Sequence, residues 1–146
     1  MIDPIAIGQT KEYILKRERE IKDGEGKVTK PANPNPTVWI IGALDSMEMN
    51  RVDSLSMKVE QIEGRVVISR NAEEVFKKDF TVVRLGLKGF RNFGSLEFKT
   101  DKVRLFDCEK DVVHDDVLKA IHPDVIYELS QEIWGSNKVD EELEKN

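Results

Sequence analysis

The segment at residues 71–93 constrains the fold most, because its apolar residues repeat at the spacing of an α-helix. The positions separated by three or four residues are Ala72, Phe76, Phe80, Val83, Leu87 and Phe90. A period of 3.6 places them on one side of a helix, so residues 71–90 are predicted to form an amphipathic helix that packs on the core. Asn71 and Glu74 match a capping box at its start. Gly86 and Gly89 weaken the last turns and mark where the helix ends or is closely approached.

The clearest strand signal is the run TVWIIGAL at residues 37–44, which is β-branched, aromatic and continuous after Pro36. Asp45 and Glu48 then have capping-box spacing, which predicts a helix over residues 45–57. Beyond it, Gly64 allows either a hairpin that turns at Glu63-Gly64 or a continuation of the helix. We favour a helix that continues to Ile62, followed by a short link at residues 66–68.

Around these elements the sequence predicts weaker structure. Residues 1–10 read as an N-terminal arm, and residues 11–20 alternate in a way that favours a half-exposed strand. Residues 21–36 contain two glycines and three prolines among charged and small residues, which indicates a long exposed loop that is flexible or used for docking. Residues 96–105 alternate as a small hairpin with its turn at residues 100–102, and residues 107–111 read as an acidic loop.

The C-terminal part is predicted to be helical. Asp115 and Asp116 cap a short helix, and Pro123 opens a second one that Gly135 ends. Residues 136–146 are a charged tail. Together these elements predict one α+β domain over residues 1–146, with three to four helices packed on a small, mostly antiparallel sheet.

Composition excludes several classes. No run of the 146 residues approaches the roughly 18 apolar residues that a membrane-spanning helix needs, and the first ten lack a signal-peptide pattern, so we expect a cytosolic protein without a membrane partner. The single cysteine, Cys108, cannot form an intrachain disulfide or a cysteine-rich metal site, and we expect a partly buried thiol.

Charge is unevenly distributed along the chain. The net charge is −1 over residues 1–57, +4 over residues 58–104 and −8 over residues 105–146, which sum to −5. A solvated surface accounts for this pattern. It is also compatible with complementary faces that let copies, or a copy and another protein, dock head to tail.

Chemical motifs are few. Phosphate-binding, dinucleotide-binding and H-E-x-x-H patterns are absent from the sequence. His114 and His122 flank a short helical segment beside aspartates, so a small metal-dependent enzyme is one alternative, but capping of helix ends explains both histidines better. Ser130 has no base that its spacing would guarantee. We therefore predict no catalytic residue, no metal site and no cofactor.

The string LKGFRNF at residues 87–93 mixes cations with aromatic residues. One interpretation is a nucleic-acid-associated accessory protein that uses the basic face of the central helix, although the acidic balance of the chain argues against it. The favoured interpretation has the aromatics in the core and the cations facing an acidic protein partner. The candidate partner contacts are Lys77, Lys78, Lys88 and Arg91, with Asp140, Glu141 and Glu142 in the acidic tail.

Three segments resemble a group of small proteins of tailed bacteriophages: PTVWIIGALDSMEMNRV (36–52), GLKGFRNF (86–93) and IHPDVIYELSQEIWGSNKVDEELEKN (121–146). This group comprises tail-assembly chaperones and accessory virion structural proteins. The resemblance implies a non-enzymatic protein that acts by protein–protein contacts in head or tail morphogenesis. Its expected partners are other phage structural proteins of the capsid, neck or tail, or copies of itself, and its expected location is the host cytoplasm during assembly, with retention in the virion left open. The loop at residues 21–36 departs from the group.

Overall fold

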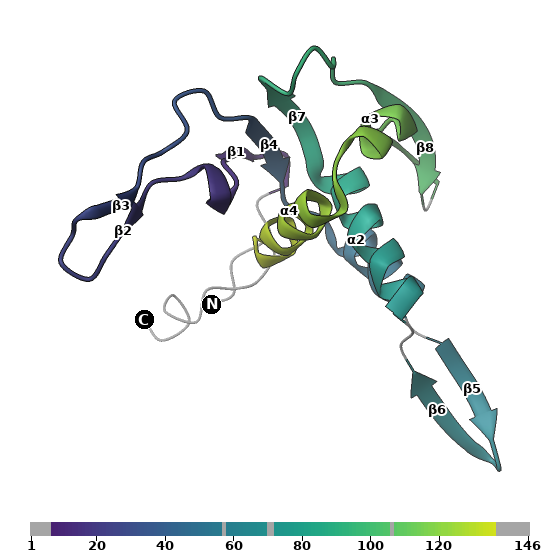
Figure 1. Ribbon diagram of the computed structural model, residues 1–146. Coiled ribbons are helices and arrows are strands. Elements are labelled where there is room, and N and C mark those ends of the chain that lie inside the picture. The colour runs from purple at the N-terminus through teal and green to yellow at the C-terminus, as the bar shows by residue number, and fades with distance from the viewer. Residues whose placement is uncertain (1–6, 57, 70–71, 106, 137–146) are drawn as a thin grey trace, which may run out of the picture.

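The computed structural model describes residues 7–56, 58–69, 72–105 and 107–136, and it has the predicted α+β architecture (Figure 1). The N-terminal arm is therefore described in part, and the charged tail beyond Ser136 lies outside the described residues. In chain order the elements are β1 (Thr10–Tyr13), the 3-10 helix η1 (Lys16–Glu18), β2 (Ile21–Lys22), β3 (Val28–Lys30), β4 (Val38–Gly42), α1 (Ser46–Ser56), β5 (Lys58–Ile62), β6 (Arg65–Ser69), α2 (Ala72–Gly86), β7 (Leu87–Arg91), β8 (Thr100–Leu105), β9 (Cys108–Val113), α3 (Asp115–Ala120) and α4 (Pro123–Gly135).

A three-stranded antiparallel sheet, in the order β1-β4-β7, is the centre of the molecule. The strand predicted at residues 37–44 is its middle member, because β4 is apolar enough to be covered along its length. Trp39 stands opposite Tyr13 on one side and Phe90 on the other. Its buried residues join those of the helices and β9 in one core, which includes Val52, Val83 and Ile126.

The prediction of one helix over residues 71–90 was wrong at its C-terminal end. Helix α2 ends at Gly86, and residues 87–91 form strand β7, which pairs with β4. A Cβ on Gly86 would lie 2.5 Å from Cγ2 of Ile133 in α4, so α2 and α4 approach closely where the helix gives way to the strand. The glycine therefore marks both a helix end and a close approach.

The helix predicted over residues 45–57 is confirmed as α1, but its continuation to Ile62 was wrong. Strands β5 and β6 pair as an antiparallel hairpin that turns at Glu63 and Gly64. The φ angles of these residues, 54° and 78°, are those of a type I′ turn, which matches the right-handed twist of paired strands. The alternative that the sequence left open is therefore the one observed.

The hairpin predicted at residues 96–105 is displaced along the chain. Strand β8 pairs with β9, and Asp107, with a φ of 62°, lies at their connection. The expected acidic loop at residues 107–111 is thus mostly strand, and Cys108 is exposed rather than partly buried. An aspartate suits a turn at either position, Asp101 or Asp107, so the local sequence does not distinguish them. Burial of Val112 and Val113 favours the observed register.

The N-terminal predictions were partly correct. The strand expected over residues 11–20 covers only β1 and is followed by η1, while the loop at residues 21–36 contains the short hairpin β2–β3. Asp23 organises the turn of this hairpin, because its carboxylate accepts hydrogen bonds from the backbone N–H groups of Glu25 and Lys27, both at 2.9 Å. The two predicted C-terminal helices are confirmed as α3 and α4, but the N-cap of α3 is His114 rather than Asp115 or Asp116, which lie in its first turn.

Candidate interaction surfaces

The four predicted basic contact residues lie on two elements rather than on one helix. Lys77 and Lys78 lie on α2, whereas Lys88 and Arg91 lie on β7 because the helix ends before them. A basic face of the central helix that includes all four residues therefore does not exist. The predicted acidic contacts Asp140, Glu141 and Glu142 are outside the described residues.

Lys78, Lys88 and Arg91 make the following contacts within the chain. The ammonium of Lys78 lies 3.5 Å from Oδ1 of Asp53 and 4.7 Å from the centre of the Trp134 ring. Lys88 donates to the carbonyl of Leu85 at 2.8 Å, and Arg91 donates to Glu12 at 2.7 Å. This hydrogen bond, followed by the positive charge of the guanidinium, lowers the pKa of the Glu12 carboxyl.

The aromatic residues of the 87–93 string are partly buried and pack against the core, as the core interpretation predicted. Phe90 and Phe93 lie with ring centres 5.8 and 4.9 Å from that of Trp39. Phe98 contacts Phe90 edge-on at 5.5 Å. Because Phe90 and Phe93 are partly buried and pack edge-on or tilted against Trp39 and against each other, they do not form an exposed stacking platform for nucleic-acid bases.

The histidines act at helix ends, which confirms the capping interpretation. Nδ1 of His114 accepts from the backbone N–H of Asp116 at 3.0 Å, and Nδ1 of His122 accepts from that of Asp124 at 3.1 Å. Each ring thereby satisfies an otherwise unpaired N–H group in the first turn. Within the described ranges, no group of three His, Cys, Asp or Glu side chains is arranged to hold a metal ion.

Ser130 serves helix packing rather than a nucleophilic arrangement. It is 2% exposed and donates to Oδ1 of Asp79 at 2.7 Å, which joins α4 to α2 through a buried polar contact. The acceptor is a carboxylate on a helix in the core, and the two described histidines cap other helix ends. A serine–histidine pair is therefore not formed there.

Two ionisable groups with shifted pKa values lie at the start of α1. Asp45 and Glu48 make the predicted capping box: Asp45 accepts from the Glu48 N–H at 2.8 Å, and Glu48 accepts from the Asp45 N–H at 3.1 Å. Burial raises the pKa of Glu48. Burial opposes ionisation of Asp45 as well, but hydrogen bonds from Lys110 and the Glu48 N–H outweigh it and lower the pKa of Asp45.

This cluster links two elements of the fold. Lys110 of β9 contacts Oδ2 of Asp45 at 2.8 Å, so the ion pair fastens the β8–β9 hairpin to the beginning of α1. A depression of about 390 Å³ lies beside it, lined by residues that include Gly42, Lys88 and Lys110. Because both carboxylates accept hydrogen bonds from the helix backbone, the cluster is accounted for by capping and tethering.

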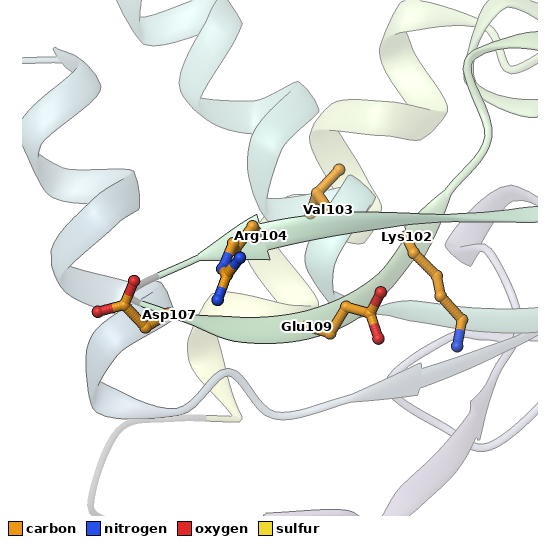
Figure 2. Close-up of a pocket in the computed structure, with 5 residues that line it drawn as sticks. All are labelled: Lys102, Val103, Arg104, Asp107 and Glu109. Atoms are coloured by element: carbon orange, nitrogen blue, oxygen red, sulfur yellow. The ribbon is translucent and has the colours of Figure 1, made fainter.

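A second depression of about 390 Å³ lies on the β8–β9 hairpin, lined by Lys102, Val103, Arg104, Asp107 and Glu109 (Figure 2). Arg104 stands directly opposite Glu109, and Lys102 stands opposite Asp111. Figure 2 shows Lys102, Arg104 and Glu109 extending to the same side of the hairpin. Alternating charges on an exposed ladder suit solubility and protect a sheet edge, and four of the five lining residues are charged, which does not suit an apolar small molecule.

Two hairpins project from the body of the protein, and they are its most distinctive surfaces (Figure 1). Hairpin β2–β3 presents Ile21 and Val28, which are 47% and 46% exposed. Hairpin β5–β6, between α1 and α2, extends away from the core as a two-stranded sheet. Hairpin β2–β3 lies within the loop at residues 21–36, for which the sequence left a docking role open. Hairpin β5–β6 was not a predicted contact site, although Glu63-Gly64 was its local signal.

Comparisons with known protein families, curated protein sequences and solved structures find no match to this chain. Among the helices that the structure describes, none is long and apolar enough to cross a membrane.

Proposed function

We propose that this protein is a non-enzymatic assembly or virion protein of a tailed bacteriophage, and that it acts through protein–protein contacts in head or tail morphogenesis. The observation that carries the proposal is the pair of hairpins that project from a packed core. A single two-stranded hairpin is marginally stable in water, so a projecting one gains stability when another protein covers it or adds strands to it.

The phage context comes from the resemblance of residues 36–52, 86–93 and 121–146 to small morphogenesis proteins. The physical character of the chain supports a contact role. Its candidate chemical groups are used internally: the histidines cap helices, Ser130 bonds to Asp79, and Asp45 and Glu48 form a capping box. The alternatives, a nucleic-acid accessory protein and a small metal-dependent enzyme, gain no comparable support.

Affinity capture from phage-infected cells tests this proposal. Tagged protein is purified at several salt concentrations, and the proteins retained are identified by mass spectrometry. We expect an identified capsid, neck or tail protein, retained at moderate salt. Retention of nucleic acid alone, with binding that falls steeply as salt rises, would instead support the nucleic-acid alternative.

A matched pair of variants on the β2–β3 hairpin makes the test specific. Val28→Lys removes an exposed apolar side chain from the projecting surface, whereas Met47→Lys makes the same change at a similarly exposed position on α1. If the hairpin contacts a virion protein, Val28→Lys weakens capture and Met47→Lys leaves it unchanged. Equal capture by both variants would place the contact elsewhere.

A further inference from the structure

Strand β6 lies at a sheet edge but has the composition of an interior strand. Among the described strands, only β4 and β6 contain four consecutive uncharged residues. Strand β4 lies between β1 and β7, so both of its edges are paired. Strand β6, with the sequence RVVIS, has β5 as its one neighbour among the described strands.

This difference matters because an unpaired edge can add strands from other chains. Natural proteins protect such edges with charged residues, and the other described strands of the two-stranded sheets follow this rule. Strand β5 has Lys58 and Glu60, and β8 has Asp101, Lys102 and Arg104. Strand β6 carries one charge, at Arg65 beside the turn, and its remaining four residues leave the edge unprotected.

The hairpin geometry identifies which backbone groups form this open edge. In a hairpin with a two-residue type I′ turn, the closing pair, here Ile62 and Arg65, exchanges both backbone hydrogen bonds. Because hydrogen-bonded and non-hydrogen-bonded pairs alternate, Val67 bonds inward to β5. The N–H and C=O groups of Val66 and Ile68 point outward, away from β5.

This outward edge is complementary to itself. When two copies of β6 pair antiparallel about a two-fold axis with full overlap, Val67 stands opposite its own copy and Arg65 stands opposite Ser69. Val66 then stands opposite Ile68 of the second copy, and the outward N–H and C=O groups of these two residues face each other in the geometry of a hydrogen-bonded pair. The same overlap of β5 would place Glu60 opposite its own copy, which like-charge repulsion disfavours.

We propose that two copies of this protein associate through their β6 edges and form a four-stranded antiparallel sheet in the order β5-β6-β6-β5. The inference deepens the proposed function, on which it rests, by naming the partner of one projecting hairpin. Pairing satisfies the outward groups of Val66 and Ile68 and converts two marginal hairpins into one four-stranded sheet.

Two proline variants test this proposal on the same rung of the ladder. Ile68 and Val59 are direct cross-strand partners, and both have outward-pointing N–H groups, one on each edge of the hairpin. Ile68→Pro removes a donor from the β6 edge without removing a hydrogen bond within the hairpin. Val59→Pro does the same on the β5 edge and is the matched control.

The measurement is the mass of the full chain by sedimentation equilibrium over a wide concentration range. We expect the wild type and Val59→Pro to rise from 16.7 kDa to twice that mass, while Ile68→Pro stays at one chain mass. Near-ultraviolet circular dichroism, which reports on the environment of the buried Trp39, establishes that both variants retain the folded core. Thermal unfolding establishes that both variants unfold as folded proteins do.

Two results would overturn the β6 pairing: a wild-type monomer at every concentration, or the same degree of association for both proline variants. If the wild type is monomeric and Ile68→Pro loses capture of an identified virion protein, the edge binds that protein instead, and the proposed function stands without the dimer. A β6-dependent dimer that captures no virion protein supports the pairing and counts against the phage assignment.

Discussion

Gly86 controls how closely α2 and α4 can pack, and its replacement by alanine gives the sharpest stability prediction. The added Cβ would lie 2.5 Å from Cγ2 and 2.9 Å from Cδ1 of Ile133, about 1 Å inside a normal carbon–carbon contact. Overpacking of this kind costs ~1–3 kcal/mol. Replacing a helical glycine by alanine gains ~0.5–1 kcal/mol, so we expect a net loss of ~0–2.5 kcal/mol, and a loss of ~1–3 kcal/mol relative to the same change at a site without the clash.

The assay is urea unfolding followed by tryptophan fluorescence. Gly135→Ala is the matched control, because Gly135 is also the last residue of a helix and a Cβ there would meet nothing within 4 Å. We expect the control to be neutral or slightly stabilising. If Gly86→Ala is as stable as this control, the close approach of the two helices is refuted.

A double variant shows whether Ile133 is the cause. Ile133→Leu keeps the side-chain volume but removes the Cγ2 branch that lies nearest to the added Cβ, at a cost under ~1.5 kcal/mol. Gly86→Ala combined with Ile133→Leu should therefore cost less than the sum of the single changes, by ~0.5–3 kcal/mol. Strict additivity would mean that the strain lies elsewhere.

The remaining predictions concern polar contacts. Ser130→Ala leaves the buried Asp79 carboxylate without its donor and should lower the free energy of unfolding by ~1–3 kcal/mol; unchanged urea unfolding would contradict this. His114→Ala removes an N-cap and should cost ~0.5–2 kcal/mol, whereas His114→Asn, which can still accept the hydrogen bond, should recover most of it. Burial raises the pKa of Glu48, so ionisation of Glu48 opposes folding as pH rises through that pKa. The stability of Glu48→Gln relative to wild type should therefore increase from acidic to neutral pH, and a difference independent of pH would refute this assignment.

Local signals in the sequence predicted the elements that local interactions determine. Asp45 and Glu48 form the expected reciprocal capping box, and His122 caps the helix that begins at Pro123. Each of these features involves residues within three positions of one another, so its physics is contained in a short window. The strand at β4 was recognisable for a related reason, since a strand paired on both sides is apolar along its length.

The errors arose where distant partners decide the structure. Leu87 and Phe90 continue the helical spacing of the preceding residues, yet they also fit a strand, and pairing with Ile41 and Trp39 selects the strand. That contact spans more than forty residues and has no local signature. The grouping of the four cations on one helix face was wrong for the same reason, because Arg91 lies on β7 and its ion pair with Glu12 forms only when β7 and β1 flank β4.

The two longest hairpins of this protein show why the β6 edge is a candidate for association. Hairpin β8–β9 is anchored: Val112 and Val113 are buried in the core, and Lys110 is tied to Asp45. Its outer strand β8 has charged residues that discourage further pairing. Hairpin β5–β6 projects from the core instead, with the charged strand β5 on one edge and the uncharged run of β6 on the other (Figure 1). A chain that protects one edge and leaves the other unprotected is suited to add strands on one side only, which favours a closed pair over an open-ended array.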